Sequence, residues 1–342
     1  MTASPDVGAS GAGRGGRSRF TSGVILTAKI AVTAVVVGYI IRRFGWGRIV
    51  DTLRDASSSW LAAALLLFFV SALLGVVQWR RLLHSRGVAL TAKRAFVLYF
   101  IGLFFNNFIF GTAAGDALRV AYVKLGTGSA RSGLAATFLD RFAGLCIMLI
   151  YAAGGSAFLL QRGLVSGTTL VAAVLSLACA LILFFGVFLF LISRRLQNLF
   201  FGVFERVPFA GGEAFRSVVM QALLEAKDRR LLWEVTGLSA VIQALRVGVH
   251  ILCGVSLGLV TPDNIHFFFV FVPILAVLMT VPLPFGIREG VGGALFALAG
   301  FPVDAALVME FLASVVGILA SSVGAICFVG AKTKPSIARY GV

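Results

Sequence analysis

The chain has 342 residues, of which 59% are hydrophobic and 13% are charged, and its formal net charge is +16. Soluble domains carry about a quarter charged residues, so this composition excludes an ordinary soluble fold. The Lys and Arg residues lie in short segments between apolar runs, not in a basic domain, so no nucleic-acid partner is expected. The composition predicts an all-α polytopic membrane protein.

Cysteines and histidines are few and scattered, and no pair of them has the spacing of a metal site: Cys146, Cys179, Cys253, Cys327, His84, His250 and His266. The chain contains no GxSxG motif and no Gly-rich phosphate loop that ends in Lys. We therefore expect neither a metal nor another cofactor, and we do not expect an enzyme.

The N-terminal segment reads as a tail followed by a helix. Residues 1–20 are rich in Gly and Ser and contain three Arg residues, which predicts a disordered basic tail. The apolar run that follows, 22–41, ends in Arg42 and Arg43 and lacks the small residues of a cleavage site. This pattern favours an uncleaved first helix over a signal peptide.

Eight apolar runs approach or reach the length of about 20 residues that a spanning helix needs. They are 22–41, 58–79, 94–113, 133–160, 167–193, 231–260, 266–284 and 304–330. These runs predict a single transmembrane domain over 21–332, followed by a short basic tail over 333–342. Phe residues alternate with charged residues in 194–230, which is typical of an amphipathic segment lying in the cytoplasmic interface.

The distribution of Lys and Arg distinguishes two topologies. If all eight runs cross the membrane, the two sides receive 15 and 12 basic residues. If the runs 94–113 and 266–284 are instead re-entrant hairpins, the numbers become 21 and 6. Basic loops stay in the cytoplasm, so the second arrangement is favoured, with about six spanning helices and both termini in the cytoplasm.

The hairpin arrangement also predicts an internal repeat. Residues 58–160 and 231–330 each read as helix, hairpin, helix, and the two hairpins open from opposite sides of the membrane. Inverted repeats of this kind are common in transporters, in which the substrate site lies at the interface of the repeats.

The first interruption of the apolar body covers residues 106–119. Asn106 and Asn107 break the helix, and the charged residues Asp116 and Arg119 follow at a spacing of three. Irregular backbone at membrane depth is tolerated where it is buried in protein or lines a wet cavity. A helix N-terminus beside an Arg can bind phosphate. The alternative is an ordinary loop with its charges among the headgroups.

The second interruption has the same character. Pro282, Pro284 and Gly286 end one limb, and Arg288 and Glu289 open the next limb. The new limb again begins with free N–H groups and the positive end of a helix dipole. Because the two interruptions occupy matching places in the two halves, they favour a shared substrate site.

Further ionisable residues lie inside the long apolar runs. Asp140 and Arg141 interrupt the run 133–160, either in the interior or at the cytoplasmic interface. Arg246 lies near the middle of 231–260, and a charge at that depth usually faces a bundle interior or cavity. Arg246 is a candidate for substrate contact, and the alternative is a structural ion pair with Glu310.

Together these motifs resemble a known family. The segments WRRLL (79–83), NN (106–107), GDALR (115–119), DRFAG (140–144) and PLPFGIREG (282–290) look like those of the flippase-like family. That family is the stand-alone relative of the transmembrane region of lysylphosphatidylglycerol synthases, and the resemblance covers about 22–330. In two places the sequence departs from the family pattern: Phe110 stands about where a Pro is usual, and Asp140 replaces the more usual Glu.

The resemblance implies an integral protein of the bacterial or archaeal plasma membrane that translocates lipids or lipid-linked headgroups. It marks a set of polar positions in this sequence: Asp116, Arg119, Asp140, Arg141, Arg288 and Glu289. The aminoacyl-transferase domain of the full synthases is absent from the 342 residues, so the resemblance does not imply synthase activity.

The leading hypothesis is a lipid transporter of the flippase type whose partner is an anionic lipid. Arg119 and Arg288 are expected to hold the phosphate, and Asp116 and Glu289 to position these arginines. The alternative hypothesis is a non-transporting membrane partner of a glycosyltransferase or lipid-synthesis enzyme. The sequence leaves the lipid, the energy source and the oligomeric state open.

Overall fold

The computed structural model describes residues 54–108, 112–127, 130–163, 228–278 and 287–332, together with Asp51 and isolated residues between 167 and 196. Every regular element in these ranges is helical. The run 22–41, both tails and nearly all of 164–227 lie outside the described residues, so the predictions for those segments stay predictions.

Each half of the described chain has the order long helix, two short helices, long helix. The first half contains α3 (Ser58–His84), α4 (Ala92–Phe108), α5 (Thr112–Thr127) and α6 (Ala130–Gln161). The second half contains α10 (Arg229–Ser256), the 3-10 turn η1 (Ile265–Phe267), α11 (Phe268–Leu278), α12 (Ile287–Leu298) and α13 (Val303–Ser321), followed by α14 (Val323–Lys332). The prediction of an all-helical fold is confirmed.

Four helical segments are long and apolar enough to cross a membrane: Ser58–His84, Ala130–Gln161, Arg229–Ser256 and Val303–Gly330. Large apolar side chains on their outer surfaces are exposed, among them Leu66, Ile150 and Leu319. A surface of this kind is stable in contact with lipid, and helices satisfy their own backbone hydrogen bonds there. The protein is therefore a multi-pass membrane protein.

The described parts of α11 and α12 are short. The helices α11 and α12 have 11 and 12 residues, which gives lengths of about 17 to 18 Å. The hydrocarbon core of a bilayer is about 30 Å thick. The described parts of both helices are therefore shorter than the hydrocarbon core is thick.

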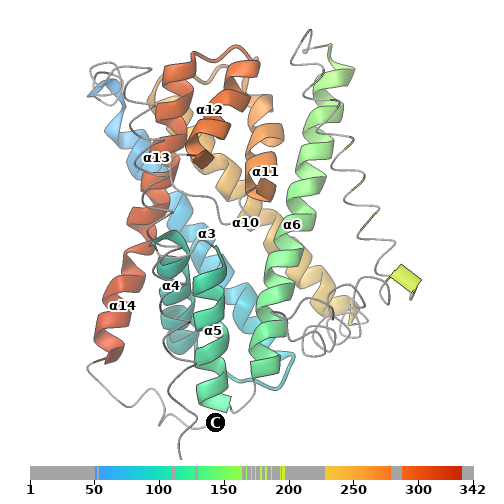
Figure 1. Cartoon of the computed structure of the whole chain (residues 1–342), viewed down its shortest axis with the longest axis vertical. Helices are drawn as coiled ribbons and strands as arrows, with labels where there is room; N and C mark the ends of the chain where they lie inside the picture. The colour runs from blue at the N-terminus through green and yellow to red at the C-terminus, as the bar shows by residue number, and fades with distance from the viewer. Residues whose placement is uncertain are drawn as a thin grey trace, which may run out of the picture.

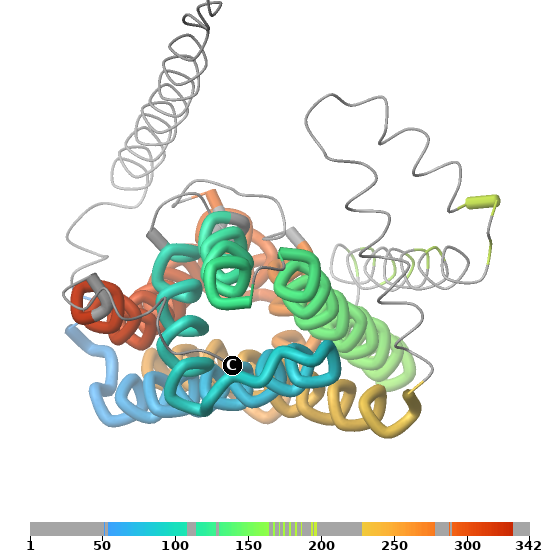
Figure 2. The backbone as a smooth tube through the Cα atoms, turned by 90° about the horizontal axis from the view of Figure 1, so that it is seen from below, coloured from blue at the N-terminus to red at the C-terminus, as the bar shows by residue number. Residues whose placement is uncertain are grey.

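The two long helices α3 and α10 run antiparallel and side by side (Figure 2). At one end, the backbone N–H of Ser57 donates to the carbonyl of Ser256 at 2.8 Å. At the other end, Arg81 Nε lies 3.8 Å from Glu234 Oε2. The two halves of the chain therefore begin with helices of opposite direction.

The two pairs of short helices occupy opposite ends of the bundle. In Figure 1, α4 and α5 lie in the lower half and α11 and α12 lie in the upper half. Each pair packs against the second long helix of the other half: α11 contacts α6 of the first half, and α4 contacts α13 of the second half. Each pair of short helices therefore contacts long helices of both halves of the chain.

Each pair of short helices has an apolar core of its own. Around α11 and α12, Phe268, Phe296 and Phe301 pack with ring centroids 4.7 to 6.0 Å apart. Around α4, the apolar core includes the fully buried side chains of Trp79 and Phe100. Because these cores occupy different ends of the bundle, the buried polar groups described below are left to the region around the tips of the hairpins.

Candidate functional site

The tip of the first hairpin is closed by Asn106. Its side-chain carbonyl oxygen accepts a hydrogen bond of 2.8 Å from the backbone N–H of Gly115, which lies in the first turn of α5. The first N–H groups of a helix have no partner within the helix, so Asn106 satisfies one of them. The Asn106 amide also donates to Asp116 Oδ1 at 3.3 Å. Asn106 thus joins the two limbs and orients the carboxylate that follows.

Gly115 allows the two limbs to approach each other. A Cβ atom at this position would collide with the carbonyl oxygen of Gly102 on α4 and would lie 2.6 Å from Asn106 Oδ1. The first collision is with backbone, which cannot rotate away. The absence of a side chain at Gly115 is therefore required for the observed hairpin.

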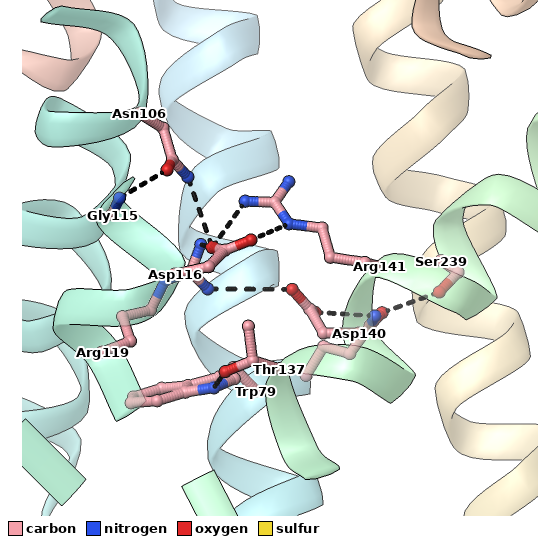
Figure 3. A network of polar contacts seen from close by, with 10 residues as sticks. Trp79, Asn106, Gly115, Asp116, Arg119, Thr137, Asp140, Arg141 and Ser239 are labelled. Atoms are coloured by element: carbon pink, nitrogen blue, oxygen red, sulfur yellow. Dashed lines mark hydrogen bonds and ion pairs between the residues drawn. The ribbon is translucent and has the colours of Figure 1, made fainter. Parts of the chain in front are cut away.

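Asp116 is the centre of an ionic network (Figure 3). Its carboxylate accepts two hydrogen bonds of 2.9 Å from Arg141 Nε and Nη2, and it lies 2.7 Å from Arg119 Nη2. Charge-assisted contacts of this two-pronged kind are the strongest hydrogen bonds in proteins. One carboxylate of α5 therefore positions an arginine on its own helix and another on α6.

Arg119 is completely enclosed, with 0% of its side chain exposed. Its guanidinium lies 4.5 Å from the ring centre of Tyr99 and 3.8 Å from Asp140 Oδ2. None of its nitrogens meets hydrogen-bond geometry with a described partner, in spite of the short distance to Asp116. Since charge attraction and stacking need no fixed angle, we conclude that these forces hold Arg119 in place.

Asp140 extends the network to the long helices α3 and α10. Its Oδ1 accepts a 3.0 Å hydrogen bond from the side-chain amide of Gln78, whose own oxygen accepts one of 3.0 Å from Ser239. The network therefore ties α3, α5, α6 and α10 together. Two carboxylates and two guanidinium groups balance, so the network carries no net charge of its own.

The two arginines of this network differ in exposure. The side chain of Arg141 is 38% exposed, whereas that of Arg119 is fully buried. A ligand that enters the polar interior can therefore reach Arg141 but not Arg119. Asn107, beside the same tip, is also exposed, and its amide donates to Ser321 Oγ of α13 at 3.0 Å.

A polar stripe follows one face of α10. Ser239, Gln243, Arg246 and His250 are spaced by four, three and four residues, which places them on the same side of a helix. Arg246 lies close enough to Asp140 to interact with it electrostatically, and its Nε has no hydrogen-bond partner among the described residues. The stripe therefore extends from the first ionic network toward the second hairpin.

A second polar cluster lies at the far end of this stripe. His250 Nδ1 is 3.1 Å from Oε1 of Glu310 on α13, and Glu310 is 0% exposed. Ser314 Oγ donates to Glu289 Oε1 of α12 at 2.6 Å and also lies 3.1 Å from the carbonyl of Glu310. The cluster thus connects α10, α12 and α13, as the first network connects α3, α5 and α6.

The structure brings together seven of the twelve residues selected from the sequence: Asn106, Asp116, Arg119, Asp140, Arg141, Arg246 and, in the second cluster, Glu289. Asn107 contacts α13 beside them. Pro282, Pro284 and Gly286 lie outside the described residues, as does the side chain of Arg288. Asp140 is buried within the protein, and its depth in the membrane stays a prediction. The ion pair considered between Arg246 and Glu310 is replaced by the contact of Glu310 with His250.

Sequence analysis missed three uncharged members of the two clusters, Gln78, Ser239 and Ser314, and it missed Ser321, the partner of Asn107. Each is a polar residue within an apolar run, and Ser314 and Ser321 continue the spacing that begins at Glu310. Within the described residues, no group of three or more His, Cys, Asp or Glu side chains is arranged to hold a metal ion.

Buried ionic networks between spanning helices and short helices define a multi-pass membrane protein with a polar interior. Residues 26–325 match the family described as lysylphosphatidylglycerol synthase TM region. The chain belongs to this family, as its motifs predicted. No match to a curated protein was found.

Proposed function

We propose that the protein is a lipid transporter of the flippase type, which moves an anionic phospholipid or lipid-linked headgroup across the plasma membrane. The observation that carries the proposal is the ionic network at Asp116, at the tip of a hairpin and within reach of Arg141. Ionisable groups at membrane depth are costly and usually mark a pathway for a substrate or ion. The family's name refers to a lipid synthase, which is consistent with a role that involves lipids.

The headgroup phosphate would bind Arg141, not Arg119. The side chain of Arg141 is partly exposed and Asp116 holds its guanidinium in a fixed direction, and a pre-positioned Arg is well suited to phosphate. Arg119 would act as a structural cation that keeps Asp116 and Asp140 in place. Arg246 would add positive charge on the α10 side of the same interior. The acyl chains would remain in the bilayer.

The proposed mechanism is alternating access by two inverted repeats. The contacts between helices support it. If α3, α4, α5 and α6 are taken to correspond to α10, α11, α12 and α13, the contacts of one half have counterparts in the other. The contact α3–α4 corresponds to α10–α11, α5–α6 to α12–α13, and α4–α13 to α11–α6. Antiparallel α3 and α10 fit an axis in the membrane plane. In this proposal, the two pairs of short helices are re-entrant hairpins.

The orientation in the membrane follows from charge. Arg80, Arg81 and Arg94 lie at the end of the bundle that holds the first hairpin, where α3 ends and α4 begins. Basic loops remain on the cytoplasmic side, so this end and both termini would face the cytoplasm of a plasma membrane. The first hairpin would then open to the cytoplasm, and the second would open to the outside.

The test is lipid movement by the purified protein in liposomes. Phosphatidylglycerol with a fluorescent headgroup would be placed in both leaflets, and a membrane-impermeant quencher would report arrival at the outer surface. We expect Arg141→Gln to slow this movement by about tenfold or more, because a charge-assisted hydrogen bond contributes about 1.5–3 kcal/mol. The matched control is Arg230→Gln, at an exposed position at the start of α10, which should move lipid at the wild-type rate.

Two further outcomes separate the proposal from its alternative. Equal rates for liposomes with and without protein would contradict transport. Co-purification of a membrane glycosyltransferase or lipid-synthesis enzyme, together with such equal rates, would support a non-transporting partner instead.

A further inference from the structure

We infer that His250 and Glu310 form a proton-binding site, and that this site couples the proposed lipid movement to a proton gradient. The coupling rests on the proposed function, whereas the proton site does not. The ligand is a proton, shared between an imidazole of α10 and a carboxylate of α13.

The geometry of the pair is that of a buried acid with a single described partner. Glu310 is 0% exposed, and its Oε1 lies 3.1 Å from His250 Nδ1. No described residue hydrogen-bonds to its other oxygen, Oε2. A buried polar atom without a partner is costly unless it gains a proton, an ion or a water molecule. The side chain of Glu310 packs directly on Gly292 of α12, where a Cβ would lie 2.7 Å from Glu310 Cγ.

Three charged or titratable groups lie near the pair. Glu289 on α12 accepts a hydrogen bond from Ser314, which also donates to the backbone carbonyl of Glu310. Cys253 on α10 interacts with Glu310 electrostatically, and Arg246 lies one turn from His250. The other titratable or charged groups of α13 and of the helices packed against it include Asp304 on α13, Tyr99 on α4, Arg288 on α12 and Cys327 on α14. The remaining groups lie near helix ends: Arg80, Arg81, His84, Lys93, Arg94, Arg229, Arg230, Glu234 and Lys332.

The two polar clusters therefore differ in chemistry. Asp116 and Asp140 are each within 4 Å of a guanidinium, and arginine does not lose its charge in proteins. In the second cluster the described side-chain partner of Glu310 is a histidine. Histidine is the side chain whose ordinary titration falls between about pH 5 and 8. Addition of one proton changes the His250–Glu310 pair from a net charge of −1 to 0.

Arg246 provides a physical link between this pair and the headgroup. It lies between Asp140, with which it interacts, and His250, four residues further along the same face of α10. When the pair carries −1, it attracts Arg246 and offsets its charge. When the pair is neutral, Arg246 is more able to attract an anionic headgroup. Binding of the proton and of the lipid anion should therefore favour each other, as linkage requires.

Proton binding is tested first and without transport. Infrared difference spectra of the purified protein in nanodiscs would be recorded on acidification from about pH 8 to about pH 5, the range in which histidine titrates. We expect a carboxylic-acid or imidazolium band that is lost in both Glu310→Gln and His250→Asn, and kept in Glu234→Gln, a partly exposed acid at the start of α10. Identical spectra for wild type and both pair variants would overturn the inference. Two variants are used because one of them could misfold. The thermal unfolding midpoints of both variants would be compared with that of the wild-type protein.

Coupling is tested in the liposome assay with an imposed pH gradient. We expect the gradient to accelerate lipid movement by the wild-type protein and by Glu234→Gln, and we expect Glu310→Gln to lose this acceleration. If the rate of lipid movement does not depend on the proton gradient, or depends on a sodium gradient instead, the coupling is overturned while the proposed function stands. If the infrared bands change with pH but the protein moves no lipid, the proton site is supported and the proposed function is contradicted.

Discussion

Asp140 and Glu310 stand in the same relation to their neighbouring helices. Asp140, on the second long helix of the first half, accepts a hydrogen bond from Gln78 of the first long helix, 62 residues earlier. Glu310, on the second long helix of the second half, contacts His250 of α10, 60 residues earlier. Both carboxylates are buried and both adjoin a short helix that begins with an acidic residue in its first or second turn.

The two acids differ in what neutralises them. Asp140 has Arg119 at 3.8 Å, whereas the described partner of Glu310 is an imidazole. The buried acid of the first half therefore lies beside a permanent charge, whereas the buried acid of the second half lies beside a histidine. This asymmetry within an otherwise parallel arrangement is what a coupled transporter would need.

Asp116→Asn should destabilise the protein. The change removes the negative charge that Arg119 and Arg141 share and leaves two guanidinium groups facing each other. Breaking a buried ion pair by removal of one partner costs about 3–5 kcal/mol. We expect a lower midpoint of thermal unfolding in detergent, and we expect the double variant Asp116→Asn/Arg141→Gln to recover part of the loss. A single variant as stable as the wild type would show that Asp116 does not organise the hairpin.

Gly115→Ala should weaken the packing of α5 on α4. The added methyl group would meet the backbone carbonyl of Gly102, and overpacking of this kind costs about 1–3 kcal/mol. The matched control is Gly237→Ala in α10, where no described atom lies within 4 Å of the added methyl group and the helix propensity should rise by about 1 kcal/mol. The measurement is again the unfolding midpoint, which should fall for the first variant and rise or stay constant for the second. A midpoint that stays constant or rises for Gly115→Ala would contradict close packing of the two limbs.

Asn107 and Ser321 should be energetically coupled. The Asn107 amide donates to Ser321 Oγ at 3.0 Å and lies 3.4 Å from the carbonyl oxygen of Gly317, which joins the first hairpin to α13. A double-mutant cycle with Asn107→Ala and Ser321→Ala should give a coupling energy of about 0.5–1.5 kcal/mol, the usual net value of one hydrogen bond. Additive losses in unfolding free energy would indicate that the two side chains do not interact. A suitable control pair is Asn107→Ala with Ser322→Ala, because Ser322 Oγ bonds to Leu319 of its own helix.

Much of the helical framework could be predicted from the sequence, for an evident reason. Apolar runs of spanning length leave few alternatives to a helix in a bilayer. The break expected at Asn106 and Asn107 is not observed there, because α4 continues through both residues to Phe108. The break expected at Pro282 lies outside the described residues. The contact of Asp116 with Arg119 was equally accessible, because residues three apart on one helix are neighbours.

The site could be predicted only in part, because its contacts depend on how helices pack. Gln78 and Asp140 are 62 residues apart, and no local pattern sets which residues of two long helices face each other. Arg246 and His250 share one face of α10, so the sequence could not decide which of them meets Glu310. Exposure is also a property of the packed bundle, which is why Arg119 was favoured over Arg141.

The two topologies make opposite predictions for loops that flank each hairpin. After replacement of the native cysteines, single cysteines would be placed at the exposed positions Ser85 and Leu125, before α4 and near the end of α5. The re-entrant arrangement puts both on the cytoplasmic side, so a membrane-impermeant maleimide added to intact cells should label neither, while a permeant maleimide labels both. If all apolar runs cross the membrane, only one of the two positions is labelled. The corresponding pair for the second hairpin is Asp263→Cys and Val303→Cys, which the re-entrant arrangement places together on the outside. Labelling of one member of this pair alone would contradict the second hairpin, and with it the inverted repeat on which alternating access depends.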